Sequence, residues 1–285
     1  MTTDSDLFLS LCNELLAKDG HDLDTQCRIA SSLGYRGLEL APGTFGATSD
    51  ATDAKILGQI RQRIVSHGLA VTGIHWLLAP FPDASLVDPS RRSYTTGILL
   101  KLVEQCSLLG GSVLVHGSPS SRQLSDKICK EVAMENAVAV LKPVVARTDD
   151  LGLTYCIEPL ARTETPFLNT VAECLELVDR VDSGSFLTMI DTSAAGHSED
   201  VAVADLIREW VPKGVIAHVQ VNDTNRGAPG MGQDPFNQIV EALKSVSWER
   251  PIAVEPFQVV IDAAVTAAIG AATMRALWTT EMSSK

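Results

Sequence analysis

The segment VIAHVQVND, residues 215–223, alternates apolar residues with polar ones, as a half-buried strand does. Three other segments have a related form, in which an apolar run ends in a carboxylate: TYCIEPL (154–160), FLTMIDT (186–192) and PIAVEPF (251–257). The ligand-type residues of these segments are Glu158, Asp191 and Glu255, together with His218 and Gln220 in the segment 215–223, so that three carboxylates and an amide or imidazole are available. Each segment is followed by a helix-like stretch, so the sequence predicts four parallel strands whose ends carry polar side chains at one edge of the sheet.

Extending outward from these segments, the whole chain alternates strand-like and helix-like stretches eight times. The predicted strands are 7–12, 37–41, 71–78, 112–117, 153–159, 186–191, 215–221 and 251–256. Between them, segments such as 23–33 and 94–109 place apolar residues at helical spacing. Glycines stand where several helices are predicted to end: Gly34, Gly68, Gly110 and Gly152.

Eight such units are typical of a (β/α)8 TIM barrel, which usually takes about 250 residues. A doubly wound open sheet is the rival fold. It is disfavoured because no glycine-rich phosphate fingerprint follows the first strand, where LCNELLAKDG stands instead. No linker or low-complexity segment interrupts the chain, so we expect residues 1–285 to form one domain.

Composition narrows the class of protein. The chain has 285 residues, of which 45% are hydrophobic and 20% charged, and a net charge of −12. The composition suits a soluble globular protein with a large core. The acidic net charge argues against nucleic acid or an anionic membrane as partner. We expect a small-molecule substrate and a homo-oligomer.

The six cysteines contain no CxxC pair and no zinc-finger spacing. They are interpreted as free, mostly buried thiols of a reducing compartment. The N-terminus, MTTDSD, does not resemble a secretory signal, and no apolar run is long enough to cross a membrane. A cytoplasmic location is therefore predicted.

Strand alternation predicts which side chains face the barrel axis. In the strand 215–221, His218 and Gln220 are predicted to point inward and Ala217 to point toward the helices. The same rule directs these residues of the other strands inward: His75, His116, Glu158, Asp191 and Glu255. The two histidines are candidates for binding substrate hydroxyls or for acid–base work, or are simply hydrogen-bonded core residues.

Carboxylates that converge inside a barrel need a counter-charge, because a buried unpaired charge is very costly. An oxygen-rich ligand set favours Mg²⁺ or Mn²⁺, with Co²⁺ or Zn²⁺ possible where an imidazole joins it. The alternative is that each carboxylate separately caps a helix or pairs with an arginine. Four such residues at equivalent strand ends favour one divalent cation.

Several longer motifs resemble the sugar-phosphate isomerase/epimerase superfamily of xylose isomerase-like TIM barrels, which includes tagatose 3-epimerase-like enzymes, hydroxypyruvate isomerases and 3-dehydroshikimate dehydratases. The motifs are GYRGLELAP (34–42), VLVHGSP (113–119), IEPLARTE (157–164), MIDT (189–192), HVQVNDTNRGAPGMG (218–232) and VEPF (254–257). The resemblance extends over nearly the whole chain. It implies a metal held by Glu158, Asp191, Gln220 and Glu255. It also implies that His218 lies deeper along its strand, because Gln220 occupies the ligand position that is often the second histidine of His-x-His.

The resemblance also implies a reaction. The two glutamates, Glu158 and Glu255, would remove and return a proton beside a carbonyl through an enediolate, while the metal polarises the substrate oxygens. This indicates an isomerase or epimerase of a small ketose, keto-acid or related polyol. Glu164 and Arg226 match substrate-contacting positions of the epimerases.

One position departs from the epimerase pattern. The histidine expected three residues after Asp191 is Ala194, and His197 is a candidate to replace it. This departure, together with Gln220, keeps open a metal-dependent lyase that dehydrates a β-hydroxy ketone, as in 3-dehydroshikimate dehydratases. A nuclease of the same fold is disfavoured by the acidic charge and the six histidines in all. A sugar-binding protein without catalysis is a further alternative.

Overall fold

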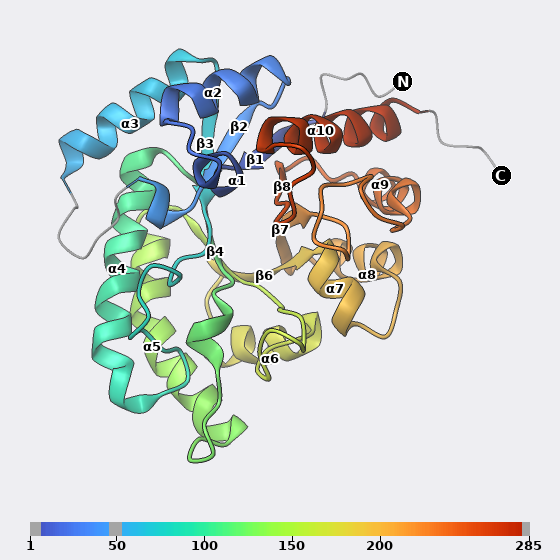
Figure 1. Cartoon of the computed structure of the whole chain (residues 1–285). Coiled ribbons are helices and arrows are strands. Elements are labelled where there is room, and N and C mark those ends of the chain that lie inside the picture. Colours follow the sequence, from blue (N-terminus) through green and yellow to red (C-terminus); the bar gives the residue numbers. More distant parts are fainter. Residues whose placement is uncertain (1–6, 46–52, 281–285) are drawn as a thin grey trace.

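The computed structural model describes residues 7–45 and 53–280. The described part of the chain contains eight strands: β1 (Leu9–Cys12), β2 (Gly37–Leu40), β3 (Ala70–Ile74), β4 (Val113–His116), β5 (Thr154–Ile157), β6 (Phe186–Asp191), β7 (Ile216–Val221) and β8 (Ile252–Val254). Each strand pairs in parallel with the next, and β1 also pairs with β8 (Figure 1). The sheet is therefore a closed single-domain barrel, which confirms the predicted fold class.

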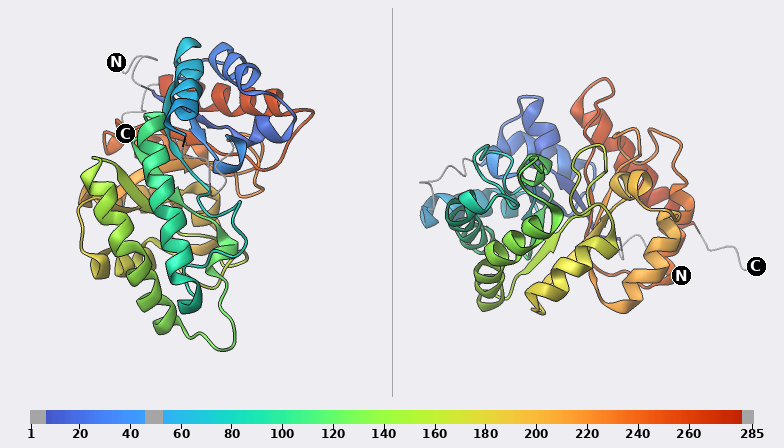
Figure 2. Two further views of the ribbon diagram at one scale, coloured as in Figure 1. Left: turned by 90° about the vertical axis from the view of Figure 1, so that its left-hand side faces the viewer. Right: turned by 90° about the horizontal axis from the view of Figure 1, so that it is seen from below.

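The helices lie outside this barrel, as two further views show (Figure 2). Their bounds are α1 (Glu14–Lys18), α2 (Leu23–Ser32), α3 (Ala54–Ser66), α4 (Arg92–Leu109), α5 (Lys130–Asp150), α6 (Val171–Val181), α7 (Thr192–Ser198), α8 (Val203–Trp210), α9 (Phe236–Ser245) and α10 (Ala263–Thr279). The short α7 starts at the end of β6 and precedes α8 on the same side of the barrel (Figure 1).

Local sequence signals set many helix ends. Asp22 starts α2 by accepting a hydrogen bond from the Thr25 amide, and Thr170 starts α6 through the Glu173 amide. Gly110 ends α4 with a φ of 81°, a left-handed conformation that favours glycine. The other predicted glycine stops also have positive φ angles. The helix-to-strand turns are thus encoded locally.

Two apolar cores lie on opposite sides of the sheet. The larger core fills the space between strands and helices. The smaller one lies inside the barrel and consists of Val113, Val115, Cys156, Met189 and Ala217. The rest of the interior contains buried polar residues, among them Ser10, Thr72, Glu39, His218 and Gln220. The barrel axis is therefore mostly polar, and most of the buried apolar side chains lie between the strands and the helices.

Ala217 corrects one sequence prediction. Thr188 pairs with Ile216 while the next residue, Met189, pairs with His218, so the register shifts at Ala217. This bulge turns Ala217 into the interior core instead of toward the helices. His218 and Gln220, beyond the bulge, keep their predicted inward orientation, because both contact the interior Glu39.

The inward orientation predicted for His116 is wrong. Val113 and Val115 face the interior, so alternation along β4 turns His116 the other way. Its Nδ1 lies 2.7 Å from the hydroxyl of Tyr155, which packs in the outer core. Burial lowers the pKa of His116 well below its ordinary value, so the imidazole is neutral. This position does not support a substrate-binding role.

The cysteines are free thiols, and all are buried except Cys129. Among the described helices, none combines the length and apolar character that crossing a membrane requires. The N-terminal hexapeptide considered for a secretory signal lies outside the described residues.

Candidate active site

Glu158, Asp191 and Glu255 come together at the carboxyl ends of β5, β6 and β8. One carboxylate oxygen from each lies within 4.8 Å of the others, and all three residues are buried. The sequence prediction that these strand ends meet is thereby supported by geometry. Three carboxylates at this separation form a group that can hold a metal ion.

Asp191 has one oxygen engaged and one unpartnered. Its Oδ1 accepts a hydrogen bond of 2.7 Å from the Ala194 amide and so caps α7. Its Oδ2 is buried and makes no hydrogen bond to any described residue. A buried carboxylate oxygen without a donor is costly, and a cation at the site would remove that cost.

The protonation of the three carboxylates reflects their crowding. Burial raises the pKa of Glu158 well above its ordinary value, and the charge of Asp191 raises it further. Burial also raises the pKa of Glu255, with added effects of Glu158 and Glu14. Burial raises the pKa of Asp191 to about 6, although the Ala194 amide acts in the opposite direction. Ionising all three carboxylates together is therefore unfavourable, and a divalent cation would offset the charge that they carry when ionised.

Glu158 is held by residues of the segment that follows β4. The buried guanidinium of Arg122 donates hydrogen bonds to the backbone carbonyls of Glu158 and His116, tying together the ends of the two strands. Gly117 also belongs to this contact, because a Cβ placed there would lie 2.2 Å from Oε2 of Glu158. Glycine thus leaves the space that the glutamate side chain occupies.

Gln220 lies beside Asp191 in the sheet, since the two residues are register partners. Its Nε2 donates to Oε1 of Glu39 over 2.8 Å, and its Oε1 is buried with no partner among the described residues. An amide oxygen is a suitable ligand for Mg²⁺ or Mn²⁺. The predicted four residues therefore fit an oxygen-rich divalent-cation site.

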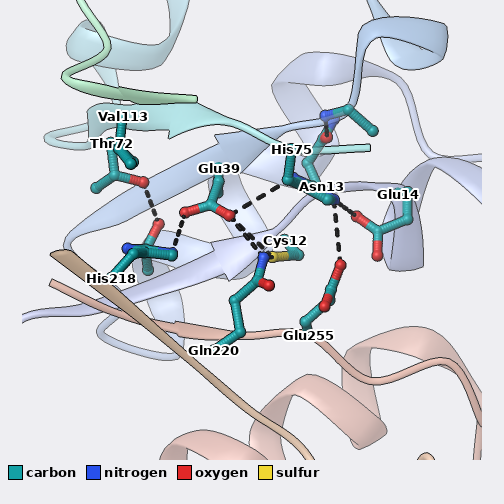
Figure 3. A network of polar contacts seen from close by, with 12 residues as sticks. Cys12, Asn13, Glu14, Glu39, Thr72, His75, Val113, His218, Gln220 and Glu255 are labelled. Carbon is teal, nitrogen blue, oxygen red and sulfur yellow. Dashed lines mark hydrogen bonds and ion pairs between the residues drawn. The ribbon is translucent and has the colours of Figure 1, made fainter. Parts of the chain in front are cut away.

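A polar network continues from this group into the barrel (Figure 3). His75 Nε2 lies 2.8 Å from Glu14 and 3.7 Å from Glu255, and its Nδ1 lies 3.8 Å from Glu39. His218 lies 2.9 Å from the other oxygen of Glu39. Two further trios have ligand atoms close enough for a metal: Glu14, His75 and Glu255, and Cys12, Glu39 and His75. His75 thus faces inward, as predicted, but its contacts are with carboxylates.

A pocket of about 230 Å³ opens above the carboxylates, and Glu158 and Asp191 line it. Trp76 and Phe257 form one wall, stacked with ring centroids 5.5 Å apart. Arg226 lies over the Phe257 ring at 4.3 Å. Glu255 is buried beside the other carboxylates and is not among the lining residues.

The remaining candidates for substrate contact also line this pocket. Glu164 and Arg226 form an ion pair of 2.8 Å. His197 is exposed, with its Nε2 2.9 Å from the carbonyl oxygen of Thr224. Ala194 lines the pocket with a methyl group only. The structure thus brings Glu164, Arg226 and His197 to the pocket and leaves His75 and His116 outside its lining.

The loop after β7 supports Arg226. The buried carboxylate of Asp223 accepts hydrogen bonds from the amides of Gly230, Gly232 and Asp234, at 2.9 to 3.0 Å. The Arg226 carbonyl accepts from the amides of Phe257 and Gln258, which joins this loop to the one after β8. The glycine-rich motif 222–232 therefore builds a compact loop that places Arg226 over the pocket.

Comparison with known proteins agrees with this geometry. A family model described as "Xylose isomerase-like TIM barrel" matches residues 27–277. The chain belongs to this family. Within the xylose isomerase-like barrels it is similar to a D-psicose 3-epimerase of Ruminiclostridium cellulolyticum, with 25% identity over 234 residues that cover 80% of this chain and 75% of that protein.

A D-psicose 3-epimerase of Enterocloster bolteae is 29% identical over 235 residues, covering 80% of this chain and 74% of that protein. The solved structure of an L-ribulose 3-epimerase has a TM-score of 0.80 at 19% identity, covering 95% of this chain and 94% of that one. This structural likeness shows the shared fold. The sequence matches make ketose 3-epimerases distant homologues of this xylose isomerase-like barrel.

Sequence reasoning missed three buried charged residues around the site of this barrel: Glu14, Glu39 and Arg122. For Glu39 a signal was present, because a charged residue between Leu38 and Leu40 in a fully buried strand needs partners. Glu14 and Arg122 follow strands in irregular or short helical segments, where alternation gives no direction. Only the three-dimensional structure could place those two.

Proposed function

We propose that this chain is a divalent-metal-dependent isomerase or epimerase of a small ketose, keto-acid or related polyol. The observation that carries the proposal is the convergence of Glu158, Asp191 and Glu255 within 4.8 Å under a pocket of sugar size. The ketose 3-epimerases among the distant homologues support the same reaction class.

In this proposal Glu158 and Glu255 share the proton transfer. One carboxylate takes the proton from the carbon beside the substrate carbonyl, and the electron pair of the broken C–H bond forms an enediolate. The other glutamate, in its acid form, gives a proton to the opposite face or to the next carbon. Burial raises the pKa of both residues, which favours the acid form that the proton-donating glutamate needs. The result is an epimer or an isomer, with no net change in protons.

The metal would be held by Glu158, Asp191, Gln220 and Glu255. When bound, a divalent cation supplies polarisation of the substrate oxygens and offsets the negative charge of the enediolate. Arg226 and Glu164 are placed to donate to and accept from substrate hydroxyls at the pocket edge. The stacked Trp76 and Phe257 offer a wall for the carbon face of a sugar.

The test is a panel of ketoses and keto-acids incubated in D₂O with protein that has been chelated and then reloaded with Mn²⁺. Products separated by chromatography should be epimers or isomers carrying one deuterium. Glu158→Gln and Glu255→Gln should each lower kcat by about 10²- to 10⁴-fold, while the exposed Glu249→Gln keeps full activity. Unchanged turnover in chelated protein, or in both site variants, would contradict the proposal.

A lyase that eliminates water from a β-hydroxy ketone is the second candidate. Ala194 favours it, because the pocket wall next to Asp191 offers a methyl group where the epimerase pattern has an imidazole. One glutamate would remove the proton beside the carbonyl and the other would protonate the hydroxyl on the neighbouring carbon, which leaves as water as the C=C bond forms. A conjugated product that absorbs ultraviolet light would identify elimination. Deuterium exchange into recovered sugar without such a product would identify epimerisation.

A further inference from the structure

Glu39 and Gln220 meet across the barrel, although they are 181 residues apart in the sequence. Glu39 belongs to β2 and Gln220 to β7, and both side chains are fully buried. Nε2 of Gln220 donates to Oε1 of Glu39 over 2.8 Å (Figure 3). This bond is the shortest one that Gln220 makes, because its other contact, to Cys12 Sγ, is 3.8 Å long.

Nitrogen and sulfur atoms of three further side chains lie near the Glu39 carboxylate. Its Oε2 lies 2.9 Å from His218 Nε2, and its Oε1 lies 3.8 Å from His75 Nδ1 and 3.8 Å from the Cys12 thiol. An ionised carboxylate can only accept hydrogen bonds. It therefore attracts the NH₂ side of the Gln220 amide and repels the oxygen side.

The orientation of the Gln220 amide leaves its oxygen available. Oε1 of Gln220 is buried and has no partner in the described part of the chain. Asp191, the register partner of Gln220 on β6, also has an unpartnered buried oxygen, Oδ2. These two unpaired oxygen atoms lie on adjacent strands, and Asp191 also belongs to the group with Glu158 and Glu255. A cation bound at that group would give such oxygen atoms a partner, whereas buried polar atoms are otherwise hydrogen-bonded.

We propose that Glu39 is the positioning residue that fixes the Gln220 amide, so that Oε1 of Gln220 is the fourth oxygen ligand of the divalent cation. This inference rests on the metal site of the proposed function and adds the group that orients its neutral ligand. Without Glu39, the amide could turn its NH₂ group toward the cation and repel it. In this proposal Glu39 contributes no ligand to the four-residue site and acts through Gln220.

The experiment is a double-mutant cycle on Mn²⁺ affinity, measured by titration calorimetry without substrate. Glu39→Gln should weaken Mn²⁺ binding by about 10- to 100-fold, as loss of a group that orients a ligand does. Gln220→Ala should weaken it by a similar factor. The double variant should bind Mn²⁺ no more weakly than Gln220→Ala alone, because Glu39 acts only through Gln220.

Glu14→Gln is the matched control for charge. Glu14 is a buried carboxylate of the same network that contacts His75 but makes no hydrogen bond to Gln220. Its loss should weaken Mn²⁺ binding by the same factor with Gln220 present or replaced by Ala. Equal effects of Glu39→Gln in both backgrounds would overturn the inference, since Glu39 would then act by charge alone.

A second pair of variants covers the case in which Glu39→Gln does not fold, as judged by its melting curve. Gln220→His keeps an N–H for Glu39 and a nitrogen for the cation, so Mn²⁺ affinity should stay within about tenfold of the parent. Gln220→Met has similar volume and neither group, so it should lose affinity. Unchanged binding by Gln220→Met would overturn the inference. If the parent protein binds no Mn²⁺, the proposed function itself fails, which is a different outcome.

Discussion

Gly117 lies against the carboxylate of Glu158, and its hydrogen is all that fits there. A methyl group at this position would lie 2.2 Å from Glu158 Oε2 and 3.2 Å from the carboxyl carbon. Gly117→Ala should therefore displace Glu158 and weaken both Mn²⁺ binding and turnover by about 10- to 100-fold. Calorimetry with Mn²⁺ and the rate on the best substrate measure the two effects.

Gly97→Ala is the control for this substitution. Gly97 lies within α4, where an added Cβ meets nothing within 4 Å. The alanine should leave Mn²⁺ affinity unchanged and raise stability by up to about 1 kcal/mol, since alanine favours the helix. Normal Mn²⁺ binding by Gly117→Ala would show that Glu158 can move aside without cost.

Among single residues, the sequence predicts those at the strand ends better than the buried residues that surround the site. Glu158, Asp191 and Glu255 could be placed because each ends an apolar run and parallel strands end at one edge. The prediction for His116 is wrong because alternation along a strand says only that neighbouring side chains face opposite sides. It does not say which of the two sides is the barrel interior. Arg122 gave no signal, since its role depends on backbone carbonyls that only the fold brings near.

Among the elements, the loop between β7 and α9 is the one in which a sequence motif most directly builds part of the pocket. Asp223 accepts three backbone hydrogen bonds from this loop, and it is fully buried. Asp223→Ala leaves three amides without their acceptor and should lower stability by about 3 kcal/mol. Because the loop carries Arg226, KM should rise more than kcat falls.

Chemical denaturation and steady-state kinetics measure these two effects, with Asp179→Ala as the control. Asp179 is an exposed residue of α6, so its loss should change neither stability nor KM. An Asp223→Ala protein with parental KM would mean that Arg226 keeps its place through its contacts with Glu164, Phe257 and Gln258.

Element boundaries followed from periodicity and from glycines at helix ends. All eight predicted strands are present; β6 has its predicted bounds, and the other seven are shorter than predicted. The bulge at Ala217 could not be predicted, because it arises where β7 adjusts its register to β6. The short helix α7 also was not expected, although its first turn is capped by Asp191 itself. One carboxylate thus serves both the helix and the candidate site.

Over the whole molecule, the closed barrel and its helical layer were predictable from eight alternations, but the polar interior was not. Alternation predicts that a side chain points inward without saying whether it meets apolar or polar partners there. The inner apolar core is small, and Glu39, His75 and His218 occupy space that larger apolar side chains would otherwise fill. The homo-oligomeric state and the cytoplasmic location stay predictions.

This concentration of buried carboxylates makes the stability of the whole chain depend on pH and metal together. The folded-state pKa of Asp191 is raised from 3.8 to about 6. The contribution of Asp191 to the free energy of unfolding is therefore fully present below about pH 4 and is lost as the pH rises through about 6. The raised pKa values of Glu158 and Glu255 extend this loss to higher pH. Mn²⁺ needs the ionised carboxylates, so its binding should release protons and strengthen as pH rises.

Melting temperatures in EDTA and in Mn²⁺ from pH 5 to pH 8 test this linkage. Mn²⁺ at about 100 times its Kd stabilises by about 2.7 kcal/mol, which corresponds to a Tm increase of about 4 to 5 °C for a chain of this length. That increase should be largest at pH 8 and should shrink toward pH 5 as protons compete for the site. In Asp191→Asn the increase should be small at every pH. A Mn²⁺ effect that is equal at pH 5 and pH 8 would mean that the three carboxylates are not the ligands.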